Sequence, residues 1–307
     1  MGAEDASKRP AEHPASPAMF LDAEHRPPAA VWLTRAALVL LIAGLFWRPV
    51  AEMVKTWRLA GSYYTHGFLI PPISAWLVWN KRAELSKRPV SHDALGYVFV
   101  GVSGLMLCAG AFLGFRVFEQ AALLPMLVGV LLVLVGRRHV EAMAFPLAFL
   151  VFMMPIPSSL TQSIAFKIKI LATEGAVFLA NLVSLPMLRQ GSYIHFKDDH
   201  LLIGEVCGGL RSLIALLALG ALLAHLSKSR AWARIGLFLM SVPVAIGANI
   251  FRIFFLCVVG YAFGSARAGG WVHGVSGILI FVVAFAAFLG LDSFLRRVAP
   301  AERQAPP

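Results

Sequence analysis

A cysteine, two glycines and an arginine stand together at the start of a long apolar segment, in the run Glu205-Val-Cys-Gly-Gly-Leu-Arg-Ser-Leu213. The thiolate is the reactive form of cysteine, and a nearby positive charge or a helix N-terminus favours it. One interpretation of the run is therefore a nucleophilic role for Cys207. The other is a buried structural cysteine in a helix that packs through its small residues.

Three further polar residues, Asn249, Arg252 and His273, fall at the membrane depth expected for Cys207. Asn249 and Arg252 lie in the outer half of a later apolar segment, with Arg252 about 12 Å from its end at 1.5 Å per residue. His273 begins the last apolar segment on the same side. A charged residue within a span is costly and is a functional hypothesis by default. The thiol, the guanidinium and the imidazole are thus predicted to converge on one leaflet from three successive helices.

This set of residue types is suited to acyl transfer. Cys207 would be the nucleophile, His273 its general base or ion-pair partner, and Arg252 the group that stabilises the oxyanion. Asn249 shares a helix face with Arg252 and would orient it or bind the substrate. The structural alternatives are pairing of Arg252 with helix carbonyls and an interfacial anchor at His273, beside Trp271.

Arg211 is a second candidate cation, because it lies one turn after Cys207 on the same helix face. It would lower the pKa of the thiol, pair with Glu205, or join the oxyanion site. Arg252 is preferred for the oxyanion, because a residue from another helix reaches across a substrate carbonyl.

The remaining candidates would bind the substrate or support the catalytic residues. Tyr64 and His66, in a polar cluster that opens the second apolar segment, would line the substrate entrance or simply form part of an aromatic belt. His66 is also the alternative base, ranked below His273. Gly208 and Gly209 would let a substrate backbone approach the helix donors. The other supporting candidate is Ser212.

Composition places the chain in a membrane. Its 307 residues are 59% hydrophobic and 14% charged, against about a quarter charged in soluble domains. The mean hydropathy is +0.75. The net charge of +11 would suggest nucleic acid in a soluble protein, but the positive-inside rule and anionic headgroups explain it better here. Membrane lipids are therefore expected as partners, and nucleic acid is not.

The hydropathy pattern predicts an all-α integral membrane protein with about eight transmembrane helices. An extracytoplasmic amphipathic helix at 158–184 and a short β-hairpin at 187–204 are expected between helices 5 and 6. Residues 1–28 are expected to be a disordered cytoplasmic tail, 29–295 the membrane catalytic domain and 296–307 a cytoplasmic C-terminal tail. The predicted spans are 31–48, 66–80, 95–114, 119–136, 142–156, 205–226, 235–260 and 272–294.

Loop charges predict the orientation. Lys and Arg are in excess on the side that holds both ends of the chain, so both termini are expected in the cytoplasm and the site in the outer leaflet. His195 and His200 with the neighbouring aspartates would suggest a metal, but no closed ligand set is evident and a solvated turn is favoured. No cofactor and no metal is expected.

Five stretches in order along the chain carry a family resemblance. They are Tyr64-Thr-His-Gly67 with the following IPPISAWLVW, FMMPIP at 152–157, EVCGGLRSL at 205–213, NIFRI at 249–253 and HGVSG at 273–277. In this combination the chain resembles the exosortase/archaeosortase family of membrane transpeptidases. The resemblance places the proposed nucleophile of the E-x-C-x-G-x-R-S motif on Cys207. It also places the arginine of N-x-x-R-I on Arg252 and the histidine before the last span on His273.

The resemblance also implies an activity and a substrate class. The expected function is cleavage of exported bacterial proteins at a C-terminal sorting signal: a short Pro-Glu-Pro-like motif, one transmembrane helix and a basic tail. A thioester at Cys207 would pass the protein to an unknown acceptor nucleophile at the bacterial inner membrane. The alternatives are a cysteine protease that only hydrolyses, and a transporter with Arg252 and His273 lining a pathway. The chain departs from the family pattern at Gly208, often Ser or Ala, and at Thr65, commonly Ser.

Overall fold

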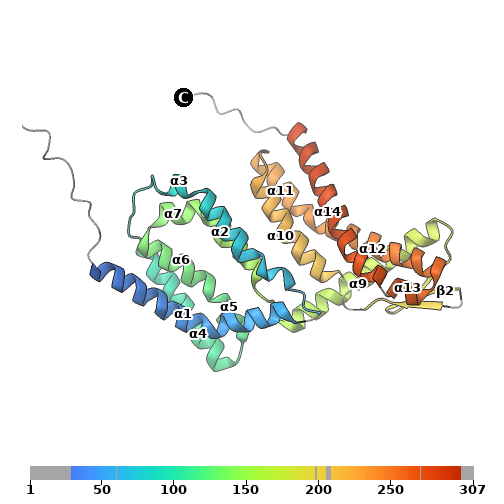
Figure 1. The fold of residues 1–307 in the computed structure, drawn as a ribbon, viewed down its shortest axis with the longest axis horizontal. Coiled ribbons are helices and arrows are strands. Elements are labelled where there is room, and N and C mark those ends of the chain that lie inside the picture. The colour runs from blue at the N-terminus through green and yellow to red at the C-terminus, as the bar shows by residue number, and fades with distance from the viewer. Residues whose placement is uncertain (1–28, 60, 198, 205–208, 270, 299–307) are drawn as a thin grey trace, which may run out of the picture. The chain divides into compact units, whose positions relative to one another are not determined.

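The computed structural model describes residues 29–59, 61–197, 199–204, 209–269 and 271–298 (Figure 1). The chain divides into two compact units, Met1–Phe46 and Trp47–Pro307. The described part of the first unit is the beginning of helix α1. Every site discussed below lies in the second unit. The tail predicted at 1–28 and residues 299–307 are outside the described residues, so the predicted domain bounds stay predictions.

Most of the described chain is helical, as predicted. Short breaks divide several of the apolar stretches into consecutive helices. The helices are α1 (Ala29–Arg58), η2 (Thr65–Phe68), α2 (Ile70–Asn80), α3 (Arg82–Leu85), α4 (Leu95–Leu113), α5 (Arg116–Ala121), α6 (Leu123–Leu134), α7 (Arg137–Ala142), α8 (Ala144–Phe149), η3 (Leu150–Met153), α9 (Ser158–Leu182), α10 (Leu210–Leu226), α11 (Ala231–Leu239), α12 (Ser241–Phe263), α13 (Ser265–Gly269) and α14 (Trp271–Val298).

Several of these helices are apolar and long enough to cross a membrane, which confirms the class of protein. Among the described residues five stretches qualify, or six if the bent pair Ala144–Met153 and Ser158–Leu182 forms one span. The count of about eight is not reproduced. The main reason is that α2 and α10 have only 11 and 17 residues, whereas crossing the apolar core takes about 20. The qualifying stretches are Ala36–Arg58, Leu95–Leu113, Arg116–Leu134, Ala231–Phe263 and Gly274–Val298.

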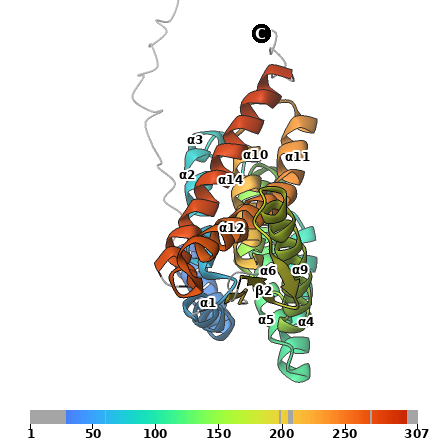
Figure 2. The ribbon, with the colours of Figure 1, turned by 90° about the vertical axis from the view of Figure 1, so that its right-hand side faces the viewer.

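The core that positions the candidate site is formed where α10, α12 and α14 pack together. Figures 1 and 2 show α10, α11 and α14 side by side. Small residues bring the backbones close: a Cβ atom added at Gly220 of α10 would lie 2.6 Å from the Cβ atom of Ser241 at the start of α12. Larger apolar side chains fill the remaining space, among them Leu216, Ile280 and Phe288.

The segment between α8 and α10 turns sharply. Helix α9 is bent by 84° from the preceding helix, at the break that contains Pro155 and Pro157. Proline favours such a break because it lacks a backbone N–H donor. The helix expected at 158–184 is therefore present, and its place at the membrane interface stays a prediction. It packs on α12, where Ile250 lies against Gly175.

The short hairpin expected at 187–204 is a three-stranded antiparallel sheet in the structure. Its strands are β1 (Leu188–Gln190), β2 (Tyr193–Phe196) and β3 (Asp199–Leu202), in the order β1-β2-β3. The extra strand arises because Leu188 pairs with His195, which also lies opposite His200. Asp199 accepts hydrogen bonds from the backbone N–H and the hydroxyl of Ser265 (2.8 and 2.9 Å), which tie β3 to α13. These bonds hold the pKa of the Asp199 carboxyl below its ordinary value.

Candidate active site

The described residues contain only part of the predicted catalytic set. Cys207, Glu205 and Gly208 lie outside them. His273 lies in the first turn of α14, but its side chain is not described. The mutual distances of Cys207, Arg252 and His273 therefore stay predictions. The structure does describe the surroundings of Arg252, together with residues that precede and follow Cys207 and His273 in the sequence.

Arg252 is held inside the helix bundle. It lies on α12, is 7% exposed, and donates a hydrogen bond from Nε to Oγ of Ser276 over 3.0 Å. A buried guanidinium needs such partners because an unpaired charge in a low-dielectric environment is costly. Ser276 is fully buried on α14, three residues after His273 and thus on the same helix face. The bond fixes Arg252 against the turn of α14 that carries His273.

Asn249, one turn before Arg252, contacts the start of α10. Its side chain is 1% exposed, and a Cβ atom added at Gly209 would lie 2.3 Å from Nδ2 of Asn249. Gly209 also has a positive φ of +83°, a conformation that glycine adopts without steric cost. This position therefore requires glycine on two grounds. The start of α10, two residues after Cys207 in the sequence, is therefore held against the Asn249 turn of α12.

Ser212 stabilises the same turn from within. Its hydroxyl donates to the carbonyl oxygen of Gly209 over 2.9 Å, one turn back along the helix. Such a local bond fixes the start of a helix rather than reaching towards a ligand. A substrate contact for Ser212 stays a prediction.

Ser276 is a residue that sequence reasoning missed. It belongs to the HGVSG stretch, and its spacing from His273 was the available signal. A hydroxyl three residues from the candidate base, in an apolar helix, lies on the face where a partner for the arginine is needed.

Tyr64 anchors the break between η3 and α9. It is 4% exposed, and its Oη accepts a hydrogen bond from the backbone N–H of Ile156 over 2.9 Å. Burial raises the pKa of the Tyr64 phenol above its ordinary value. Nearby, Trp57 donates from Nε1 to the carbonyl oxygen of Met153 over 3.0 Å. Both contacts hold the bent segment in place, and a substrate contact for Tyr64 stays a prediction.

His66 and Arg211, which sequence reasoning treated separately, line the same cavity of about 440 Å³. Nε2 of His66 donates to the carbonyl oxygen of Phe152 over 3.1 Å. Nε and Nη2 of Arg211 and Nδ1 of His66 are buried without a hydrogen-bond partner among the described residues. Apart from Thr65, the rest of the lining is apolar: Leu69, Ile70, Ile73, Phe149, Ala215, Ala218, Leu219, Leu222 and Phe281.

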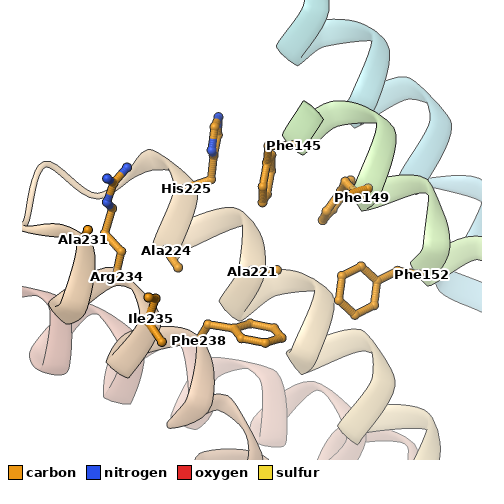
Figure 3. A pocket seen from close by; sticks show the side chains of 11 residues that line it. Phe145, Phe149, Phe152, Ala221, Ala224, His225, Ala231, Arg234, Ile235 and Phe238 are labelled. Carbon is orange, nitrogen blue, oxygen red and sulfur yellow. The ribbon is translucent and has the colours of Figure 1, made fainter. Parts of the chain in front are cut away.

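A second cavity, of about 460 Å³, lies between α8, η3, α10 and α11 (Figure 3). Aromatic rings dominate it, and Figure 3 shows the rings of His225 and Phe145 face to face. Their centroids are 3.8 Å apart with an interplanar angle of 1°. Arg234 lines the same cavity. None of the predicted site residues that the structure describes does so.

The fold and the site together define a class of protein: a multi-pass helical membrane protein with a polar site among its helices. The chain belongs to the transmembrane exosortase family (Exosortase_EpsH), whose model matches residues 56–290, about three quarters of its length. The match includes every described site residue from Tyr64 to Ser276. No curated protein and no solved structure matches the chain. Membership supports a transpeptidase-type role in protein sorting at a membrane.

Proposed function

We propose that the chain is a membrane cysteine transpeptidase that cleaves the C-terminal sorting signal of exported proteins and transfers them to an acceptor. The observation that carries the proposal is the turn of α12 from Asn249 to Arg252. This turn contacts Gly209 and Ser276, the described neighbours of Cys207 and His273. A buried arginine in such a junction is pre-positioned for charge that develops in a reaction.

The proposed chemistry proceeds in two steps. The Cys207 thiolate attacks the scissile carbonyl, and Arg252 stabilises the oxyanion that forms. The oxyanion collapses to a thioester, and the C–N bond breaks as His273 protonates the leaving amine. An acceptor nucleophile then loses its proton to His273 and attacks the thioester. This step releases the transferred protein and restores the Cys207 thiolate and the protonated His273.

The substrate and the location of the reaction follow from the resemblance and from loop charge. The substrate carries a Pro-Glu-Pro-like motif, one transmembrane helix and a basic tail. The excess of Lys and Arg on one side favours cytoplasmic termini and a site in the outer leaflet of a bacterial inner membrane. The substrate helix would then enter laterally and present its motif at the site.

Replacement of the nucleophile is the decisive experiment. Cys207→Ala should abolish processing of a reporter that carries the sorting signal, while the amount of enzyme in the membrane is unchanged. Cys108→Ala is the matched control, because Cys108 is exposed on α4, which packs on α5 and α6, and processing should persist. Unimpaired cleavage by the Cys207→Ala enzyme would end the proposal.

Mass analysis of the released reporter separates transfer from hydrolysis, since both use the same nucleophile. A new group on its C-terminal carboxyl means transfer to an acceptor. A free carboxylate means that water resolves the thioester and that the enzyme is a protease only.

A further inference from the structure

Two donor atoms of Arg211 have no hydrogen-bond acceptor in the part of the chain that the structure describes. Nε and Nη2 are buried and have no partner among the described residues. A guanidinium carries five N–H donors and stays charged, so burying part of it unpaired is unfavourable. The apolar cavity that Arg211 lines has room for a group that would supply the acceptor.

The cavity continues from Arg211 along one face of α10. Arg211, Ala215, Ala218 and Leu222 follow one another at helical spacing over about 16 Å. The two alanines leave the space that larger side chains would fill. Helices α2 and α14 supply apolar walls, with Ile70, Ile73 and Phe281. The result is a groove with a cation at one end of the α10 face and only apolar side chains beyond it.

The groove is accessible from outside the bundle. Leu69 and Phe281, which line it, are 62% and 42% exposed respectively, so a ligand can reach it laterally. His66 adds a second polar group to the lining. Since Nε2 already donates to the carbonyl oxygen of Phe152, Nδ1 is the ring atom left for a ligand.

We propose that this groove binds the sorting segment of the substrate, an inference that rests on the proposed function. Arg211 binds the carboxylate of the acidic residue in the sorting motif, and the apolar face of α10 receives the start of the substrate helix. An acidic group followed by an apolar helix matches the order of cation and apolar side chains along the groove. The cation would repel a basic segment, so the basic tail does not bind here. Arg211 then determines specificity and leaves the oxyanion to Arg252.

Two reporters that differ only in charge test this assignment. One carries the acidic residue of the sorting motif, and the other has glutamine at that position. Both are assayed with full-length enzyme in membrane vesicles. The wild-type enzyme should process the acidic reporter at least about tenfold faster, as expected for a charge-assisted pair. Arg211→Gln should remove that preference by slowing the acidic reporter and leaving the glutamine reporter nearly unchanged. Arg211→Lys should restore part of the preference.

Filling the groove provides an independent test on the same helix. Ala215→Leu places a large side chain in the groove, whereas Ala224→Leu, the matched control, fills the second cavity. Ala215→Leu should slow processing of the acidic reporter at least about tenfold, as a lost apolar binding surface does, and Ala224→Leu should leave the rate unchanged. Equal effects of the two substitutions would overturn the assignment.

Three other outcomes would also overturn it. Equal slowing of both reporters by Arg211→Gln would place Arg211 in the oxyanion or thiolate machinery. If Glu205→Gln reproduces the loss of preference, Glu205 is the partner of Arg211. If raising the phosphatidylglycerol content of the vesicles inhibits the wild-type enzyme but not Arg211→Gln, the groove binds an anionic lipid.

The failure of this inference is distinguishable from that of the proposed function. A wild-type enzyme that processes neither reporter argues against the function itself. A wild-type enzyme that processes both at the same rate, while Cys207→Ala processes neither, leaves the function intact and removes only the role of Arg211.

Discussion

Arg252 and Arg211 both lie within apolar helices, in different surroundings. Arg252 on α12 is packed at a helix junction, with Nε bonded to Ser276 and with Asn249 one turn away against Gly209. Arg211 on α10 borders a cavity, and two of its nitrogen atoms are buried without a partner among the described residues. The first guanidinium is fixed by neighbouring side chains, and the second has donors that no described residue pairs.

The difference separates two uses of a cation within a helix bundle. A group that stabilises developing charge is most effective when it is already oriented, because no reorganisation is needed during the reaction. A group that selects a substrate gains most when its donors are satisfied only by the correct ligand, because a wrong ligand leaves them unpaired. The packed arginine fits the first use and the arginine in the groove fits the second.

The largest effect is expected from Arg252. Arg252→Lys should reduce the processing rate by about 100- to 1,000-fold, the usual cost of losing a donor to an oxyanion. Lysine keeps the charge but lacks the planar fork that bonds Ser276 and an oxyanion together. The measurement is the initial rate of reporter processing per amount of enzyme in the membrane.

Arg267→Lys is the matched control, since Arg267 is exposed on α13 and should tolerate the same change. A near-normal rate for Arg252→Lys would show that the packed arginine is structural, and the contrast with Arg211 would then be wrong.

The sequence was sufficient to predict the class of protein, whereas the membrane depth of the polar groups stays a prediction. Hydropathy and helical spacing are local properties, so Asn249 and Arg252 were placed on one helix face correctly. The bond from Arg252 to Ser276 was not predicted, because it depends on how α12 and α14 rotate against each other. The shared cavity of His66 and Arg211 likewise depends on packing between segments far apart in the chain.

The spans were harder to predict than the helices. The expected span 66–80 begins with the short η2, so that α2 retains only 11 residues. The expected span 31–48 belongs to a helix that continues to Arg58, although Pro49 lies within it. Proline is tolerated in such helices where neighbouring groups satisfy the freed carbonyl. Hydropathy marks apolar stretches well, but their ends depend on tertiary contacts.

A smaller effect is expected at Gly209, the contact between the Arg252 helix and the start of α10. Gly209→Ala meets two costs: the left-handed backbone, about 1–2 kcal/mol, and overpacking against Asn249, typically about 1–3 kcal/mol. Gly114→Ala has the first cost alone, because Gly114 is also left-handed but has open space around it. The measurement is thermal unfolding in detergent together with the processing rate.

Gly209→Ala should therefore unfold at a lower temperature than Gly114→Ala and process the reporter more slowly. Equal unfolding temperatures for the two variants would mean that the start of α10 is not held against Asn249. In that case the junction would be looser than the contrast with the groove requires.

The smallest of the three effects is expected at Ser276. Ser276→Ala removes the hydroxyl that accepts from Nε of Arg252, and hydrogen bonds to charged groups contribute about 1.5–3 kcal/mol. Part of that contribution orients Arg252. Its loss should reduce the processing rate by roughly tenfold. Ser163→Ala is the control, because its hydroxyl is exposed and bonds only within α9.

The preference for an acidic reporter should survive in Ser276→Ala, since Arg211 is untouched. Loss of that preference would show that the two arginines act as one unit. A slower enzyme that still selects the acidic reporter would assign the reaction rate to Arg252 and substrate selection to Arg211.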